Sequence, residues 1–591
     1  MKRVGIIIFA IIFSLLFSAC QTGRELKQLQ RLHESYGSDK GTNMYVNDDD
    51  ILDRGPEKGG TLNLFTTKPD TLNPILTTNS YTADLLTFVY EGLTRLDRDQ
   101  EAVPCLSDRW TVSEDRLIWE FHVRDDVTWH DGESFTAYDV EFTIQTILNP
   151  SINSPYKSLL ANISQCVATD SSTIRIALKK PNSFMPEMMT FPVLPKHQFS
   201  TTDVLTASRE LVPVGTGPYR FVSYDEGNGI SLTLNEDWWY LRTDGTLASD
   251  GMYIENIRAG ILKKAEDAMG ALQTGEVDVV SLGFSEYMKY MDRTDLTIKS
   301  YTSRNFEFIA LNPDDPVLSD IYARRAICLA IDREEIIRDV LRGAAEEADL
   351  PVLPACWLED DEDAEKQPEA DHTGDEPDEN QDRQDDPQAD TIASTPSEVL
   401  EAGGWKQSEQ GYYKVIKGSR RYLSLELLVN SNNSIRVKAA EMICGQLEKA
   451  GIKVSLVQLQ WKDMLNRIST GRYKMAFLGC RVPQVPDVSF MYSDGYLPYA
   501  SSSAYSEAYN VTGYGNKAVD EYILEIFKEN DAQARKAAYK ALKAQVLDDC
   551  PYIGLYFLRE AMVFGRYVKG PMGPHAWNRF DDFRRWYKPS P

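Results

Sequence analysis

The chain has 591 residues, too many for one ordinary domain, and 42% of them are hydrophobic, enough to bury a large core. Its formal net charge of −26 repels nucleic-acid phosphate, so we expect no nucleic-acid partner. The acidity is concentrated, because residues 359–390 hold 16 acids against two bases. The rest of the chain has the mildly acidic character of an ordinary soluble surface.

Residues 1–19 have the layout of a bacterial signal peptide. Lys2 and Arg3 precede an apolar run at 4–17, which is shorter than the roughly 20 residues that cross a membrane. The sequence Phe-Ser-Ala-Cys that ends at Cys20 resembles a lipobox. We therefore expect Cys20 to be acylated and to anchor the mature protein to the membrane. Plain secretion, with cleavage just before Cys20, is the alternative.

Residues 20–58 are polar and are predicted to form a tether. Seven cysteines follow it, and they cannot all pair with one another. No CxxC or zinc-type spacing occurs among them, so buried free thiols and one or two disulfides both stay open. These cysteines are Cys105, Cys166, Cys328, Cys356, Cys444, Cys480 and Cys550.

The remaining chain alternates between strand and helix patterns. Period-two patterns predict strands, helical spacing predicts helices, and Thr136 is a plausible N-cap with Asp139 in the first turn. No strict βαβ repeat occurs, which favours large α/β lobes. The predicted strands are 59–64, 117–123, 173–178 and 230–234, and the predicted helices are 81–90, 265–274, 321–341 and 462–468.

Residues 359–390 form a segment of different character. The segment contains no Phe, Tyr, Trp, Val, Leu or Ile, so it cannot bury enough apolar surface to offset the entropy of ordering it. We predict a disordered acidic insertion in a surface loop, with binding of a cation or a partner as the alternative.

The sequence carries no motif of a common catalytic or nucleotide-binding site. It lacks a GxxxxGK[ST] phosphate loop, a GxGxxG fingerprint, an HExxH helix and a GxSxG turn, and its six histidines have no metal-ligand spacing. We therefore predict a protein that is not an enzyme and that holds no metal and no cofactor.

Several segments together resemble the family 5 extracellular solute-binding proteins, which include oligopeptide-, dipeptide- and nickel-binding members. The resemblance extends over about residues 59–583, and its tryptophans Trp110, Trp119 and Trp129 are expected to pack a lobe. The segments are 106–110, 119–132, 135–140, 215–221, 272–278, 324–327 and 330–333, with Asn235 and Trp238.

The resemblance implies an α/β fold, a two-lobed periplasmic-binding-protein-like clamshell of type II with an extra subdomain. It places residues 59–91, 206–300 and 564–591 in lobe I, residues 92–205 in the extra subdomain and residues 301–563 in lobe II. Ligand would be enclosed between the lobes, and closure would be a hinge motion that a membrane partner recognises.

The resemblance also implies where ligand binds. Tyr156 falls on a family tyrosine that reaches into the cleft, and Trp461 on a pocket tryptophan; a core position at the start of a helix is the alternative for Trp461. Gly479, with its neighbours Cys480 and Arg481, falls where the family's backbone pairs with a peptide as if adding a strand.

One departure from the family is informative. The aspartate that usually pairs with a peptide's ammonium group falls here on Pro483, and residues 478–486 contain no acid. Either the amino terminus of the ligand is held elsewhere, or the ligand is not a free-amine peptide. Arg481 introduces a cation that either pairs with a carboxylate or faces solvent.

These observations predict a monomeric, lipid-anchored substrate-binding protein that passes a peptide or peptide-like solute to the permease and ATPase of an ABC importer. A peptide-sensing receptor on the same fold is an alternative, as is a binder of nickel, haem or a saccharide. An extracytoplasmic hydrolase is a further alternative of another class.

Overall fold

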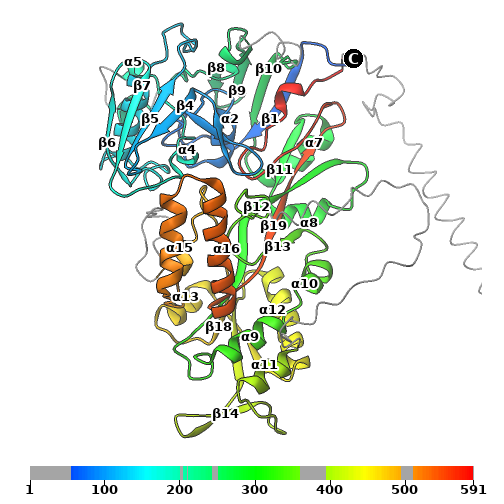
Figure 1. Ribbon diagram of the computed structural model, residues 1–591. Helices are drawn as coiled ribbons and strands as arrows, with labels where there is room; N and C mark the ends of the chain where they lie inside the picture. Colours follow the sequence, from blue (N-terminus) through cyan, green and yellow to red (C-terminus); the bar gives the residue numbers. More distant parts are fainter. Residues whose placement is uncertain are drawn as a thin grey trace, which may run out of the picture. The chain divides into compact units, whose positions relative to one another are not determined.

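The computed structural model describes residues 55–199, 204–208, 211–241, 251–359, 395–493 and 510–589 (Figure 1). Residues 56–588 form one compact unit. The predicted signal peptide, Cys20, most of the tether and residues 360–390 of the acidic insertion lie outside the described residues.

The first strand of the folded chain, β1, belongs to a four-stranded sheet with the order β1-β10-β9-β8. In this sheet β1 is parallel to β10, and the other pairs are antiparallel. Asn79 caps the helix α2 that follows β1, because its side chain accepts the backbone N–H groups of Tyr81 and Thr82. The elements are β1 (Thr61–Thr66), α2 (Ser80–Leu86), β8 (Tyr219–Asp225), β9 (Gly229–Leu234) and β10 (Asn256–Ile261).

A second four-stranded sheet, β4-β5-β7-β6, lies wholly within the predicted extra subdomain. The helix α3 packs on β6 and β7, and Thr136 is its N-cap with Asp139 in the first turn, as predicted. The Asp139 carboxylate accepts hydrogen bonds from the backbone and hydroxyl of Thr136. The elements are β2 (Thr94–Leu96), β3 (Ala102–Pro104), β4 (Ser107–Val112), β5 (Ile118–Val123), α3 (Ala137–Leu148), β6 (Ile163–Ala168), β7 (Thr173–Leu178), α4 (Met185–Met188), α5 (Lys196–Phe199) and α6 (Val204–Ala207).

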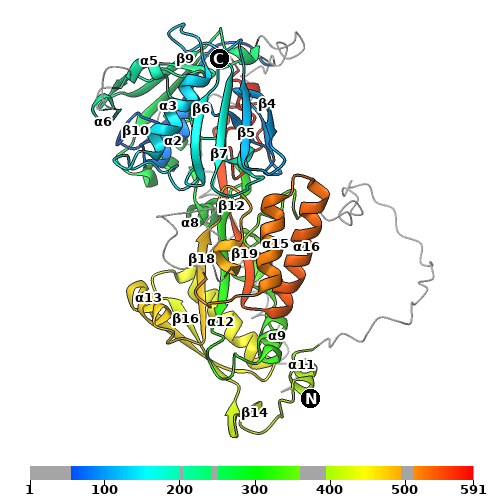
Figure 2. The same cartoon turned by 60° about the vertical axis from the view of Figure 1, so that its left-hand side comes forward.

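A seven-stranded sheet forms the rest of the body, in the order β11-β19-β12-β18-β16-β17, with β13 also paired to β19. Its long central strands β12 and β19 contain the predicted lobe boundaries at 300 and 563, so each strand continues from one predicted lobe into the other (Figures 1 and 2). The strands are β11 (Val279–Leu282), β12 (Thr297–Leu311), β13 (Ala345–Glu347), β16 (Ser424–Asn430), β17 (Lys453–Leu459), β18 (Met475–Arg481) and β19 (Tyr552–Phe564).

Helices bury both faces of this sheet. Met475 and Phe477 of β18 contribute to one core, and the alternating Ala476, Leu478 and Cys480 contribute to another. The helices α15 and α16 lie side by side in both views (Figures 1 and 2). The other elements are α7 (Ala268–Thr274), α8 (Phe284–Tyr290), α9 (Ile321–Leu329), α10 (Arg333–Asp339), α11 (Pro396–Ala402), β14 (Tyr413–Ile416), β15 (Ser419–Tyr422), α12 (Ser434–Lys449), α13 (Trp461–Ser469), α14 (Ser489–Tyr492), α15 (Lys517–Lys528) and α16 (Ala532–Asp549).

The prediction of one helix over 321–341 is wrong, because the chain forms α9 and then α10. Asp332 separates them: its carboxylate accepts the Glu335 N–H and so caps the second helix. Gln446 fixes the break, since its amide donates to the Asp332 carbonyl and accepts the Asp332 N–H. A capping aspartate that finds a tertiary partner therefore overrides the continuous helical spacing.

A half-buried histidine holds the family-like segment 215–221, which leads into β8. His130 Nε2 donates to the Gly217 carbonyl at 3.0 Å, and His130 Nδ1 accepts the Gly215 N–H at 3.2 Å. Burial lowers the pKa of His130 to about 4, so the ring is neutral at pH 7. A Cβ on Gly215 would lie 1.8 Å from the Val89 carbonyl oxygen, which explains why only glycine fits there.

A buried carboxylate joins the same loop to the tryptophans that follow it. Glu91 accepts hydrogen bonds from Trp239 Nε1 at 2.9 Å, Trp238 Nε1 at 3.2 Å and Thr216 Oγ1 at 2.9 Å. Burial raises the pKa of Glu91 to about 7 in spite of these donors. With Trp119 and Trp129 also buried, the resemblance motifs are mainly structural, as predicted.

Replacing Glu91 by glutamine tests this raised pKa. An acid whose pKa rises on folding contributes less to stability as pH increases from 4.5 towards about 7, because the native state holds its proton longer than the unfolded state. The E91Q variant loses acceptor capacity at every pH but does not titrate. We expect its free energy of unfolding, relative to the wild type, to improve by up to about 3 kcal/mol between pH 4.5 and pH 8, since each tenfold change in proton affinity is about 1.4 kcal/mol. Urea unfolding across this range measures the difference; a constant difference would contradict the raised pKa.

Candidate functional site

The strand β18 is paired along its whole length on one side only. Its partner β12 is in register from Asn305 opposite Arg481 to Leu311 opposite Met475. On the other side β16 pairs only at Met475 and Ala476. On its other side β16 pairs with β17 along its whole length. Beyond Asn430 the chain stays beside β17, since Ser431 N–H donates to the Leu459 carbonyl. The last part of β18 therefore has an open edge.

The hydrogen-bond pattern identifies which backbone groups point to this edge. Val482 N–H donates to Arg304, and Asn312 N–H donates to Lys474, so the even-numbered residues of this segment bond to β12. The N–H and C=O groups of Gly479 and Arg481 therefore point away from β12. No strand within the described ranges pairs with these two residues on that side. They present donors and acceptors at the spacing that an extended main chain requires.

Gly479 is the position where a side chain would collide with a buried ion pair. Glu307, directly across from it on β12, receives Arg436 Nε and Nη2 at 2.7 Å each. The side chains of Arg436 and Glu307 are only 12% and 9% exposed. A Cβ on Gly479 would lie 2.5 Å from atoms of both partners. The missing side chain thus leaves room for the pair while the backbone stays half-exposed.

Polar side chains continue past this point on the same face of the sheet. Arg481 lies opposite Asn305, and Asn305 Nδ2 donates to Glu560 Oε1 of β19 at 3.1 Å. Tyr301, paired with Glu560 across the strands, donates its hydroxyl to Glu560 Oε2 at 3.1 Å. The Arg481 guanidinium is exposed and makes no hydrogen bond or ion pair within the described part of the chain.

These polar side chains on β12, β18 and β19 connect to segments of predicted lobe I. Arg579, from the tail after β19, donates to Asp84 of α2 at 2.6 Å and also bonds to the Tyr301 hydroxyl. Burial raises the pKa of Asp84 although the charges of Arg579 and Arg481 oppose that change. Burial works against the Arg579 charge, yet the surrounding acids raise its pKa above the usual value. We call Asp84, Arg579, Tyr301, Glu560, Asn305 and Arg481 the polar row.

Of the other predicted ligand residues, Cys480 shares β18 with Gly479, whereas Tyr156 and Trp461 lie on separate segments. Tyr156 is half-buried beside Phe191, with ring centroids 6.5 Å apart, and burial raises its pKa to about 12. Trp461 begins α13 and is 41% exposed, so it is not a core residue. Cys480 is buried on the face of β18 opposite to Gly479. No hydrogen bond, ion pair or ring contact in the described ranges joins Tyr156 or Trp461 to β18.

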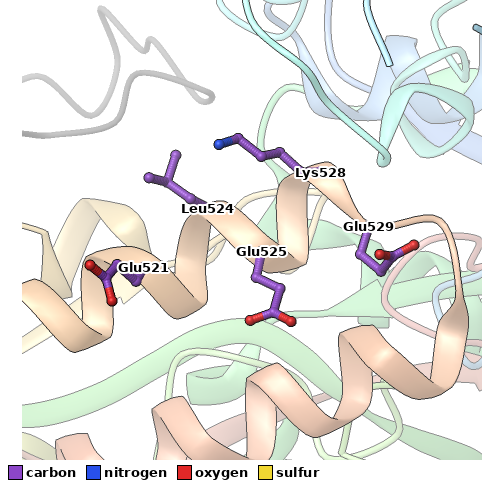
Figure 3. A pocket seen from close by; sticks show the side chains of 5 residues that line it. All are labelled: Glu521, Leu524, Glu525, Lys528 and Glu529. Atoms are coloured by element: carbon purple, nitrogen blue, oxygen red, sulfur yellow. The ribbon is translucent and has the colours of Figure 1, made fainter. Parts of the chain in front are cut away.

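A shallow hollow of about 310 Å³ lies elsewhere, on α15. Figure 3 shows its described lining, which comes from this single helix: Glu521, Leu524, Glu525, Lys528 and Glu529. None of the predicted ligand residues is among its described lining. The open edge of β18 with the polar row is therefore the candidate site.

Sequence reasoning missed the acids and cations around this edge. Glu307 stands inside the apolar stretch Phe306–Leu311, where a lone carboxylate signals a buried partner. Its partner Arg436 and the row members Asp84 and Glu560 come from distant segments, so sequence alone carries no sign of their meeting. Within the described residues, no group of three His, Cys, Asp or Glu side chains is arranged to hold a metal ion. In the same ranges no helix has the length and apolar character needed to cross a bilayer.

The fold and site define a class of protein. The chain combines helix-covered mixed sheets with long strands that continue from one predicted lobe to the other and with an inserted subdomain. This is the two-lobed clamshell of periplasmic-type solute-binding proteins, which confirms the predicted fold class. Residues 101–501 match the family model of the bacterial extracellular solute-binding proteins, family 5. The chain belongs to this family, which places it outside the cytoplasm.

Relatives cover nearly the whole chain at low identity. The oligopeptide-binding protein AppA of Bacillus subtilis is 21% identical over 525 residues, which are 87% of this chain and 89% of the relative. The structure of that protein with a nonapeptide has a TM-score of 0.56 at 20% identity and covers 90% of this chain and all of its own. NikZ of Campylobacter jejuni, solved with Ni(L-His), has a TM-score of 0.59 at 22% identity, with 90% of this chain and 100% of that chain covered. Such identities show the shared fold.

The buried ion pair beneath Gly479 yields a stability prediction. Glu307→Gln removes one charge and leaves the Arg436 guanidinium buried without its carboxylate, which typically costs about 3 kcal/mol or more. Urea unfolding of E307Q should show this loss. The matched control is Glu521→Gln, whose partner Lys517 is exposed and whose loss should cost less than about 0.5 kcal/mol. Equal stability of the two variants would contradict the role of the pair.

Proposed function

We propose that this protein is the substrate-binding lipoprotein of an ABC importer that captures peptides or peptide-like solutes and passes them to the membrane permease. It acts by binding and conformational closure, without catalysis. The observation that carries the proposal is the open edge of β18 at Gly479 and Arg481. An extended ligand adds there as a strand, and its main chain supplies affinity that does not depend on its side chains.

We infer that two further predicted ligand residues complete the site for a peptide-like ligand. The exposed indole of Trp461 has a flat apolar surface, and Tyr156 has a half-buried ring in the predicted extra subdomain. Arg481 has an exposed planar guanidinium that suits a ligand carboxylate. The amino terminus of a peptide cannot meet an acid in residues 478–486, and Glu307 is already paired with Arg436. We propose Glu560 and Asp84 of the polar row as the carboxylates that take this role.

The relatives support the same class of ligand. AppA of Bacillus subtilis is named for oligopeptide binding and was solved with a nonapeptide. NikZ was solved with Ni(L-His), so nickel complexes are also held on this fold. The edge of β18 favours a ligand with a main chain, because its free groups are backbone donors and acceptors at strand spacing.

N-methylation of a peptide tests strand addition directly. In an added strand only every second residue bonds to β18, so methyl groups should weaken binding at alternate positions. We expect each bonding position to lose about tenfold to a hundredfold in affinity, since an unmade hydrogen bond costs about 1–3 kcal/mol. The best binder from a pool of random hexapeptides, resynthesised with single N-methyl groups, is measured by titration calorimetry. Equal losses at every position, or none, would contradict main-chain pairing; failure of every hexapeptide to bind would contradict the function itself.

Lipidation at Cys20 is tested in the bacterial envelope. Cells that express the wild type and are fed radiolabelled palmitate should yield a labelled, membrane-associated protein, whereas Cys20→Ser should take up no label. Cys444→Ser, which changes a helical cysteine in the folded body, should behave as the wild type does. Recovery of unlabelled wild-type protein from the medium would establish plain secretion instead.

A further inference from the structure

Two cysteines from distant segments lie side by side. Cys328 is in the last turn of α9, and Cys550 ends α16. Cys550 Sγ lies 3.7 Å from the carbonyl oxygen of Arg324, which is one helical turn before Cys328. The two thiols are close enough that each is the largest influence on the pKa of the other. In both views α9 lies against one end of α16 (Figures 1 and 2).

The neighbouring contacts hold this arrangement independently of the thiols. The Arg324 guanidinium donates Nε at 3.0 Å and Nη2 at 2.8 Å to the carbonyl of Asp549, the last residue of α16. Arg325 forms an ion pair with Asp548 one residue earlier. Cys550 itself adopts a left-handed conformation with φ of 46°, which ends the helix and turns its side chain toward α9.

The two thiols differ in acidity in the way that exchange chemistry requires. The hydrogen bond with Cys550 lowers the pKa of Cys328 in spite of burial, and Arg333 adds to the lowering. The same interaction and burial raise the pKa of Cys550. Cys328 is also the more exposed of the two, because Cys550 is 1% accessible. Cys328 is therefore the thiol that an external reagent meets first and as the better thiolate.

The other described cysteines have no comparable neighbour. Cys105 lies against the Glu91 carboxylate, and burial raises the pKa of Cys166 and of Cys356 to about 12. No thiol is among the groups that influence Cys444 or Cys480 in the described chain. The structure thus selects one pair where the sequence left the pairing open.

We propose that Cys328 and Cys550, both reduced in this structure, form a disulfide that joins α9 to the end of α16 once the protein is outside the cytoplasm. The oxidant is a disulfide, either of a small molecule or of a dithiol oxidoreductase. The Cys328 thiolate attacks one sulfur of that disulfide and releases the other as a thiolate. Cys550 then loses its proton, and its thiolate attacks Cys328 Sγ in this mixed disulfide, so that the remaining oxidant sulfur leaves as a thiolate. Two cysteine thiols become one S–S bond, and the oxidant disulfide becomes two thiols.

The bond would secure the end of α16 that faces away from the predicted extra subdomain. The turn of the hairpin, where α15 ends and α16 begins, contacts that subdomain: Ser183 N–H donates to the Phe527 carbonyl, and Arg535 stacks on Phe184. A bridge at Cys550 would tie the opposite end of α16 to α9 covalently.

Peptide mapping of the full chain under non-reducing conditions tests the proposal. Trypsin places Cys328 in the peptide 326–333 and Cys550 in the peptide 544–559, each with a single cysteine. After incubation of the folded protein with oxidised glutathione, we expect these two peptides to appear as one linked species. Reductant should release them and should lower the midpoint of thermal unfolding by roughly 5 °C.

Single variants supply the controls. Cys328→Ser and Cys550→Ser should each abolish the linked species and the effect of reductant on thermal unfolding, and the double variant should unfold at the same temperature as either single one. Cys444→Ser should keep both properties. Complete alkylation of Cys328 and Cys550 in the oxidised, denatured protein would overturn the proposal, as would a stable glutathione adduct on Cys328.

Discussion

The incomplete pairing of β18 is the constraint on which the candidate site depends. An unpaired strand edge is a liability in a soluble protein, because it can pair with any other chain. Here the open groups are confined to Gly479 and Arg481, and charges surround them: the Glu307–Arg436 pair beneath the first and the Arg481 guanidinium beside the second. Charge at an edge discourages pairing with a second copy while it leaves room for a short extended ligand.

The same strands form both the site and the connection between the lobes. β12 lies beside β18 at the candidate site, and farther along it pairs with β19 where both strands continue toward predicted lobe I. The polar row follows this path, from Arg481 through Glu560 to Arg579 and Asp84. Under the proposed function, a ligand that alters the charge balance at one end of the row acts on contacts between segments of predicted lobes I and II, and this would couple binding to hinge closure.

The fold was largely predictable because its elements have clear periodicity. The strands near 117–123, 173–178 and 230–234 are present within a residue or two, and Thr136 is the N-cap of α3 with Asp139 in the first turn, as expected. The break in 321–341 was not predictable, because the cap at Asp332 is completed by Gln446 from a distant helix. Local pattern predicts local structure, and it is silent where a tertiary hydrogen bond decides between two local solutions.

The site shows the same division more sharply. The resemblance could indicate Gly479, since a glycine at a fixed place in a motif is visible in sequence, but the reason for that glycine lies in Glu307 and Arg436, which are far from it along the chain. Trp461 could be either core or surface from its helical position, and only the packing of α13 decides that its indole is exposed. The absence of an acid after Gly479 becomes meaningful for the same reason: the carboxylates that we propose in its place, Glu560 and Asp84, come from another strand and a helix. A sequence thus shows which backbone positions are special, whereas the charges that give a solute-binding site its selectivity are assembled by the fold.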